Sequence, residues 1–194
     1  MGVSTETFGF IHQSLMVAVP DLQFKGKQIV ELGDQKFNPQ VAISLDGHRV
    51  WTKGYFQKLG FEHTYIDWHG QNNSIALDLA NPFYFGEFDI LTNLGTSEHV
   101  LDQHRCWQNI HNLVRAGGMF IHVVPKTGML LHHSPYSYQT EFFKHLAALN
   151  EYQVMFMQYQ CTNGCHAVCM IKQVAQPFIW DGTGLVNNED RTDL

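Results

Sequence analysis

The sequence predicts a single α/β domain, with a mostly parallel sheet covered by helices on both faces and ending in an antiparallel hairpin. Three observations predict this fold. Short apolar runs typical of buried strands alternate with longer segments of helical periodicity. The last two strand-like runs are separated by Asn163-Gly164, a pair typical of hairpin turns. The chain of 194 residues also has the length of one compact domain.

The first helix is predicted at residues 4–17, because Phe8, Ile11 and Leu15 share one helical face. Three more segments with helical periodicity follow later in the chain. Two glycines inside the first of these later segments predict a break in its helix. The later helices are expected at 41–59, 100–114 and 138–150.

The strands are predicted from short apolar or alternating runs bounded by glycine, asparagine or acidic residues. The polar segment after residue 180 is expected to be loose. The expected organisation is therefore an N-terminal helical segment at 1–24, a main domain at 25–180 and a tail at 181–194. The expected strands are 28–32, 63–66, 75–79, 89–94, 119–124, 152–159 and 166–174.

The composition excludes several classes of protein. A hydrophobic share of 44% with 15% charged residues is typical of a globular chain and excludes a disordered one. The net charge of −6 has the wrong sign for a protein that binds phosphate backbones. Apolar runs such as 119–125 are shorter than the roughly 20 residues needed to span a bilayer. We expect a cytoplasmic protein with neither a nucleic-acid nor a membrane partner. Its oligomeric state is not constrained by the sequence.

Three of the four cysteines, Cys161, Cys165 and Cys169, recur at every fourth residue. Zinc sites usually pair their cysteines as C-x2-C, and this segment instead has the pattern of a turn followed by an alternating strand. We therefore expect no metal site.

The residues that follow the first strand have the chemistry of a ligand site. Ligands of parallel sheets bind at the carboxyl ends of the strands, near the point where the strand order reverses. Gly33 would let the backbone approach a ligand, and the carboxylates of Glu31 and Asp34 could bind an ammonium group. An ordinary turn at the end of the strand is the alternative.

The exits of the next two strands add to this pattern. Asp67 stands where a carboxylate can accept hydrogen bonds from the two hydroxyls of a ribose, or where it could simply cap a turn. Asp78 could bind the amino edge of an adenine while Leu79 packs on its ring. A turn or helix cap is the alternative for Asp78.

These motifs resemble those of class I S-adenosylmethionine-dependent methyltransferases, over nearly the whole span 28–172. IVELGDQ resembles the first motif, YIDWHG the acidic second-strand motif and IALDLANP the adenine-side motif. FDILTNLGTSEHV resembles the fourth-strand motif, and NIHNLVRAGGMFIHVVP the helix, double glycine and fifth strand that follow it. Within the family, the chain looks most like a small bacterial-type subgroup.

The resemblance implies a Rossmann-like sheet of seven strands, with the last strand inserted antiparallel. It implies methyl transfer from S-adenosylmethionine, with S-adenosylhomocysteine as the product. The N-terminal segment 1–24 would cap the cofactor site. The residues that it assigns to the cofactor are Glu31, Gly33, Asp34, Gln35, Asp67, Asp78, Leu79, Asn93 and Gly95.

The chain departs from the family pattern in two places. Gln35 stands where the family often has a second glycine, which alters the close approach of the backbone to the methionine moiety. The interval from Gly33 to Asp67 is longer than usual, which implies an insertion that forms part of a substrate pocket or lid.

The reacting groups are expected at the exits of the fourth and fifth strands. Methyl transfer from a sulfonium is an in-line displacement, so the protein aligns the acceptor and removes a proton where the acceptor carries one. The candidate catalytic bases are Glu98, His99, His132 and His133. The alternative role of Glu98 and His99 is a capping pair at the start of the next helix, and that of His132 and His133 is an exposed loop. The aromatic candidates for the wall of an acceptor pocket are Phe8, Phe10, Tyr136 and Tyr138.

The expected acceptor is a small molecule or a glycan. NLGT stands where methyltransferases of exocyclic amines in nucleic acids have an N/D-P-P-Y-like motif. A nicotinamide dehydrogenase would need G-x-G-x-x-G after the first strand, and the chain lacks it. The alternative function is a catalytically silent module on the same fold that binds S-adenosylmethionine or a partner protein, and Gln35 motivates it.

Overall fold

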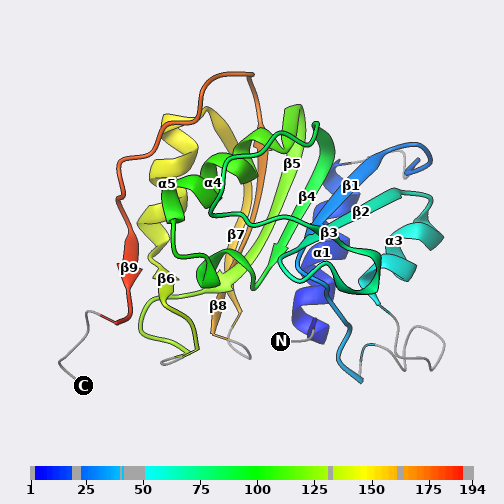
Figure 1. Cartoon of the computed structure of the whole chain (residues 1–194), viewed down its shortest axis with the longest axis horizontal. Helices are drawn as coiled ribbons and strands as arrows, with labels where there is room; N and C mark the ends of the chain where they lie inside the picture. Colours follow the sequence, from blue (N-terminus) through cyan, green and yellow to red (C-terminus); the bar gives the residue numbers. More distant parts are fainter. Residues whose placement is uncertain are drawn as a thin grey trace.

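The computed structural model describes residues 3–18, 23–39, 41, 51–130, 133–160 and 164–189. It confirms the predicted α/β fold, with a seven-stranded sheet in the order β3-β2-β1-β4-β5-β8-β7 (Figure 1). β1 to β5 pair in parallel, and the order reverses between β1 and β4. The strands are β1 Gln28–Leu32, β2 Glu62–Asp67, β3 Ile75–Ala76, β4 Phe88–Leu94, β5 Val114–Pro125, β7 Tyr152–Gln160 and β8 Cys165–Lys172.

The antiparallel end of the sheet has the expected arrangement. β7 and β8 form the predicted hairpin, and β8 lies between β5 and β7, antiparallel to both. Within its turn, Gly164 is described and residues 161–163, including Cys161, lie outside the described residues.

Helices cover both faces of the sheet (Figure 1). On one face, Phe10 of α1 and Phe56 of α3 pack in a cluster with Ile29 of β1. On the other face, Trp107 of α4 and Phe142 of α5 pack in a second cluster that also contains β1 side chains. Successive side chains of a strand point to opposite faces, so each central strand contributes to both clusters. The helices are α1 Thr5–Ala18, α3 Thr52–Leu59, α4 Gln103–Asn112 and α5 Thr140–Leu149.

Several element bounds differ from the prediction for local reasons. α4 begins after Asp102, whose carboxylate accepts a hydrogen bond from the backbone N–H of Arg105 at 2.9 Å. The third strand stops at Ala76, because the next residues turn around Asp78, which accepts the N–H of Ala80. Of the helix expected at 41–59, the structure shows α3, and residues 42–50 lie outside the described residues.

The segment after residue 180 departs from the expected loose tail. β9, Leu185–Asn187, pairs antiparallel with β6, Tyr136–Tyr138, as a two-stranded sheet. Asn188 holds this strand from its side chain, accepting from Ser137 Oγ at 2.7 Å and donating to the carbonyl of Ser134 at 2.9 Å. The expectation of a loose tail is wrong up to residue 189, and residues 190–194 lie outside the described residues.

The N-terminal helix α1 belongs to the core of the domain. Phe10, Ile11 and Leu15 are each only 1% exposed and pack against the sheet, which confirms the predicted apolar face. Phe8 packs edge-on against Phe37 and Tyr55. In the part of the chain that the structure describes, no helix is both long enough and apolar enough to cross a membrane.

Candidate functional site

A cavity of about 680 Å³ opens at the carboxyl ends of β1 to β4, beside the point where the strand order reverses. Its volume lies within the range of 300–1,000 Å³ that is typical of small-ligand sites. Seven of the nine residues assigned to the cofactor line it: Gly33, Asp34, Gln35, Asp67, Asp78, Leu79 and Gly95. The site is therefore built from the turns that end neighbouring strands, as parallel sheets generally build theirs.

Gly33 shapes the turn after β1. Its φ of +81° lies in the left-handed region, and its N–H donates to the carbonyl of Ile66 at 2.7 Å. A Cβ at this position would lie 2.7 Å from Oγ1 of Thr96, which is itself held at 2.8 Å by the carbonyl of Leu32. Only glycine fits this turn without displacing its neighbours.

Asp67 at the end of β2 combines the two roles that the sequence left open. Its carboxylate accepts the backbone N–H of His69 at 2.8 Å and that of Asp34 at 3.3 Å, so it does cap the turn. The side chain also lines the cavity. A carboxylate has about four acceptor positions, so the oriented group retains capacity for two hydroxyl donors.

The next part of the wall is mixed polar and apolar. Asp78 accepts the N–H of Ala80 and the side-chain amide of Asn81, each at 2.9 Å, and Leu79 is buried beside it. Trp68 and Leu101 also line the cavity, although they are 74% and 70% exposed, and they offer apolar surface at its rim. Neither residue was predicted from the sequence, although Trp68 directly follows β2 and Leu101 lies in the segment after β4.

The residues present fit an adenosine-type cofactor. The cavity combines a glycine turn that a Cβ would close, an oriented carboxylate suited to a diol, and a second carboxylate beside apolar side chains. The same cavity therefore offers hydrogen-bond acceptors for a ribose and for an amine, and apolar surface against which a ring can pack.

Asn93 and Glu31 do not line this cavity. Asn93 is completely buried, where its amide donates to Ser97 Oγ at 2.8 Å and its oxygen accepts the N–H of Ser97 at 3.2 Å. It thereby holds the turn after β4. Tyr138, one of the four aromatic candidates for an acceptor wall, is also fully buried, with its hydroxyl 3.0 Å from Ser97 Oγ.

The other aromatic candidates also lie outside the lining of the larger cavity. Phe8 and Phe10 pack in the core under α1. The Tyr136 hydroxyl donates to the carbonyl of Leu101 at 3.0 Å, which ties it to the rim of the cavity. None of the residues described in the N-terminal helix lines the cavity.

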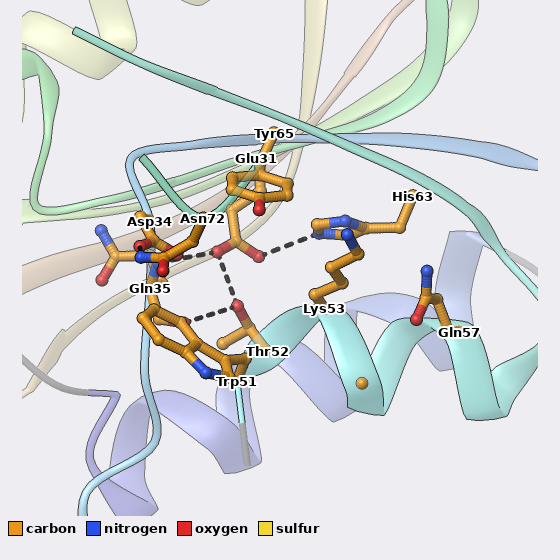
Figure 2. A pocket seen from close by; sticks show the side chains of 11 residues that line it. Glu31, Asp34, Gln35, Trp51, Thr52, Lys53, Gln57, His63, Tyr65 and Asn72 are labelled. Atoms are coloured by element: carbon orange, nitrogen blue, oxygen red, sulfur yellow. Dashed lines mark hydrogen bonds and ion pairs between the residues drawn. The ribbon is translucent and has the colours of Figure 1, made fainter. Parts of the chain in front are cut away.

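Glu31 lies instead in a second, smaller pocket of about 380 Å³ between β1, β2 and the start of α3 (Figure 2). One carboxylate oxygen accepts the hydroxyl of Thr52 at 2.6 Å and the N–H of Gln35 at 3.2 Å, and the other lies 3.3 Å from Nε2 of His63. Burial raises the pKa of Glu31, and the contacts with His63 and Thr52 oppose that rise. Both carboxylate oxygens of Glu31 are therefore occupied by contacts that join β1 to α3 and to β2.

Asp34 and Gln35 line both pockets, so the turn after β1 is the partition between them. The carbonyl of Gln35 accepts the N–H of Thr52 at 3.3 Å and its hydroxyl at 3.1 Å. The side-chain amide of Gln35 would lie 2.9 Å from a Cβ at Gly33. Gln35, which stands where a second glycine was expected, therefore fills the space beside Gly33.

Three of the four catalytic candidates come together beside the larger cavity. Glu98 and His99 belong to a short turn of helix, Ser97–His99, and His133 approaches from the segment after β5. Oε1 of Glu98 lies 4.0 Å from Nε2 of His99 and 3.9 Å from Nε2 of His133. His99 also lines the cavity, so this cluster borders it. His132 lies outside the described residues.

Burial dominates the electrostatics of this cluster. The Glu98 side chain is 1% exposed, and desolvation raises its pKa to about 8. Desolvation also lowers the pKa of His99 and of His133 below the ordinary histidine value. Each group is therefore displaced toward its neutral form.

Comparison with known proteins gives matches in structure alone. No protein-family model matches the chain, and no curated protein matches it significantly. A proposed S-adenosylmethionine-dependent methyltransferase from Listeria monocytogenes is similar with a TM-score of 0.58 at 9% identity, covering 86% of this chain and 100% of that one. The N-methyltransferase NodS from Bradyrhizobium japonicum WM9, in complex with S-adenosyl-L-homocysteine, is similar with a TM-score of 0.52 at 12% identity, covering 87% and 88%.

The [4+2]-cyclase SpnF is also similar, with a TM-score of 0.54 at 11% identity, covering 84% of this chain and 81% of SpnF. Likeness at such low identity concerns the fold. The chain has the Rossmann-like fold of class I S-adenosylmethionine-dependent methyltransferases, as its motifs predicted.

Proposed function

We propose that this protein binds S-adenosylmethionine in the larger cavity and transfers its methyl group to a small-molecule or glycan acceptor. One observation carries the proposal. Gly33, Asp67 and Asp78, which end three successive strands, line a single cavity on a fold shared with methyltransferases. When bound, S-adenosylmethionine supplies an electrophilic methyl group on a sulfonium.

The chain's own residues would bind and orient the donor. Asp67, already oriented by two backbone N–H groups, would accept hydrogen bonds from the ribose hydroxyls. Asp78 would accept from the amino edge of the adenine, and Leu79 would pack on its ring. The turn at Gly33 would admit the rest of the donor close to the backbone, with Asp34, Gln35 and Gly95 completing the wall.

The acceptor would bind on the side of Glu98, His99 and His133. His99 lines the cavity, and the cluster offers carboxylate and imidazole groups that could receive a proton from an acceptor that carries one. The net charge of −6 supports a small molecule or a glycan over a nucleic acid.

The test is a calorimetric and thermal-shift titration with S-adenosylmethionine and S-adenosylhomocysteine, using Asp67→Ala. Loss of hydrogen bonds to a charged group should weaken binding by roughly tenfold or more, since such bonds are worth about 1.5 to 3 kcal/mol. Asp181→Ala is the matched control. Asp181 accepts the N–H of Thr183, two residues on, just as Asp67 accepts that of His69, but it does not line the cavity.

Unchanged affinity in Asp67→Ala would contradict the assignment of the donor site. Equal weakening in both variants would mean that the loss comes from the turn and not from the ligand contact.

A second candidate function is donor binding without methyl transfer. Gln35 in place of a glycine and the likeness to a cyclase favour it. Screening acceptors for formation of S-adenosylhomocysteine separates the two candidates. Product formation that is lost in Asp67→Ala supports methyl transfer, whereas binding with no turnover across the acceptors supports the second candidate.

A further inference from the structure

The cluster of Glu98, His99 and His133 contains polar atoms that the described protein leaves unsatisfied. Oε2 of Glu98 and Nε2 of His133 are both buried and have no hydrogen-bond partner among the described residues. The two histidines do not satisfy the carboxylate, because their Nε2 atoms lie 4.0 and 3.9 Å from Oε1, beyond hydrogen-bond distance. Buried polar atoms without partners are costly, so such a group of them calls for a ligand.

The two unsatisfied atoms and the neighbouring Nε2 of His99 indicate the chemistry of that ligand. One imidazole nitrogen from each histidine and one carboxylate oxygen all lie within 4.8 Å of one another. A metal cation can bind all three atoms at once, because both atom types can donate an electron pair. A Lys or Arg side chain from within the described residues does not fill this place, since the ion pairs of Glu98 there involve only the two histidines.

We propose that Glu98, His99 and His133 bind one divalent transition-metal ion at the edge of the larger cavity. Two imidazoles with one carboxylate suit ions such as Zn²⁺, Co²⁺ or Fe²⁺, whereas Mg²⁺ and Ca²⁺ prefer sites made of oxygen ligands. No metal site was expected from the sequence, because the cysteine spacing does not fit zinc, the histidines are mostly scattered singly and few acidic residues follow Asn93.

The separations in the cluster are close to those of a bound site. With metal–ligand distances of about 2.1 Å, ligand atoms around a tetrahedral ion lie roughly 3.4 Å apart. The observed separations of 4.0 and 3.9 Å therefore need a contraction of about half an ångström per pair. The His99 and His133 side chains are 46% and 27% exposed, so they are the groups with room to adjust.

The turn that carries Glu98 is held in place by residues behind it. Ser97 receives a hydrogen bond from the Asn93 amide at 2.8 Å, and its own N–H donates to the Asn93 oxygen at 3.2 Å. The buried Tyr138 hydroxyl lies 3.0 Å from Ser97 Oγ. Metal sites typically rely on such supporting contacts to orient their ligands.

The role of the ion, as distinct from its binding, rests on the proposed function. Three protein ligands leave at least one coordination position open. An acceptor oxygen could take that position, which would place hydroxyl acceptors beside the donor cavity through His99.

The experiment measures metal binding by the full chain in the absence of cofactor. Metal-free protein is titrated with Zn²⁺ by calorimetry and with Co²⁺ by visible absorption, with Mg²⁺ as a comparison. We expect one equivalent of Zn²⁺ or Co²⁺ to bind and to raise the thermal midpoint, and Mg²⁺ to do neither. His99→Gln and His133→Gln should each weaken binding at least about tenfold, since even supporting residues contribute 10- to 100-fold.

His145→Gln is the matched control, because His145 also lies 4.0 Å from a carboxylate, that of Asp181, but has no third ligand group beside it among the described residues. Retained binding in this control with loss in both cluster variants supports the site. Absence of stoichiometric Zn²⁺ binding, or binding that both cluster variants retain, would overturn it.

The two proposals fail separately. Binding of S-adenosylmethionine without binding of Zn²⁺ or Co²⁺ overturns the metal site and leaves the proposed function standing. Binding of the metal without binding of S-adenosylmethionine or S-adenosylhomocysteine supports the metal site and overturns the proposed function.

Discussion

Asp67 and Asp78 each hold a turn and face the cavity with the same carboxylate. The hydrogen bonds from backbone N–H groups fix the orientation of each side chain before any ligand binds. Preorganised groups lose less entropy when they bind, so a turn-capping carboxylate is a good ligand group for that very reason. At these positions the two roles that the sequence left open, a turn cap and a ligand group, are therefore compatible.

Gly33→Ala should destabilise the protein and weaken donor binding. The left-handed φ costs roughly 1 to 2 kcal/mol for a residue with a side chain. Its Cβ would also lie 2.7 Å from Thr96 Oγ1, an atom fixed close to its own backbone. Gly26→Ala is the matched control, since φ there is +78° and nothing lies within 4 Å of the added Cβ. Urea unfolding should show the larger loss for Gly33→Ala, whereas equal losses would mean that Thr96 moves aside freely.

The individual site residues differ in how far the sequence could predict them. The positions of Gly33 and Asp67 at the cavity were predictable because Gly33 directly follows β1 and Asp67 ends β2, and both strands are recognisable from their own residues. The role of Glu31 was not, because its partners Thr52 and His63 lie 21 and 32 residues further along the chain. No local sequence pattern predicts that the hydrogen-bonding positions of a carboxylate will be occupied by groups so far along the chain.

At the scale of elements, polar contacts order β9, which lies in the segment after residue 180 that was expected to be loose. β9 is only half-buried, and its residues form no apolar run that would mark a strand. It is ordered by pairing with β6, about 50 residues earlier, and by the side chain of Asn188. β1 was predictable as a short apolar run, and β8 as an alternating run after a turn; both are buried on both faces of the sheet.

Asn188→Ala should loosen this strand. The variant loses the hydrogen bonds to Ser137 Oγ and to the Ser134 carbonyl, each worth about 1 kcal/mol net. Asn187→Ala is the comparison, because the Asn187 side chain accepts only a local bond from the N–H of Glu189 among the contacts described. We expect limited proteolysis to cut the C-terminal segment faster in Asn188→Ala. Equal cleavage in the two variants would contradict the role given to Asn188.

At the scale of the whole molecule, two buried histidines make stability depend on pH. Burial lowers the pKa of His122 to about 3, and burial with the nearby charge of Lys172 lowers that of His111 to about 4. Both bind protons near pH 6.5 once unfolded. Between these values each of the two histidines is more protonated in the unfolded chain, so its contribution to stability rises with pH and is lost on acidification.

In urea unfolding between pH 7 and pH 4.5, each of these two histidines should therefore contribute a loss of up to roughly 1.4 kcal/mol per pH unit, and Glu98, whose pKa burial raises to about 8, should contribute in the opposite direction. His122→Phe should reduce this slope, because His122 lies among the rings of Trp107, Phe120 and Phe143 and a neutral ring can replace it. An unchanged slope in His122→Phe would show that this histidine is protonated in the native state.

The position of β8 has a consequence for how the chain assembles. β8 is the last strand of the large sheet in sequence, yet it lies between β5 and β7 and is buried on both faces. Until residue 172 has left the ribosome, β5 and β7 have no partner on their facing edges, and open strand edges favour aggregation. The sheet should therefore be most prone to aggregation between the synthesis of β7 and the release of β8, when one missing strand still separates two unfinished parts of the sheet.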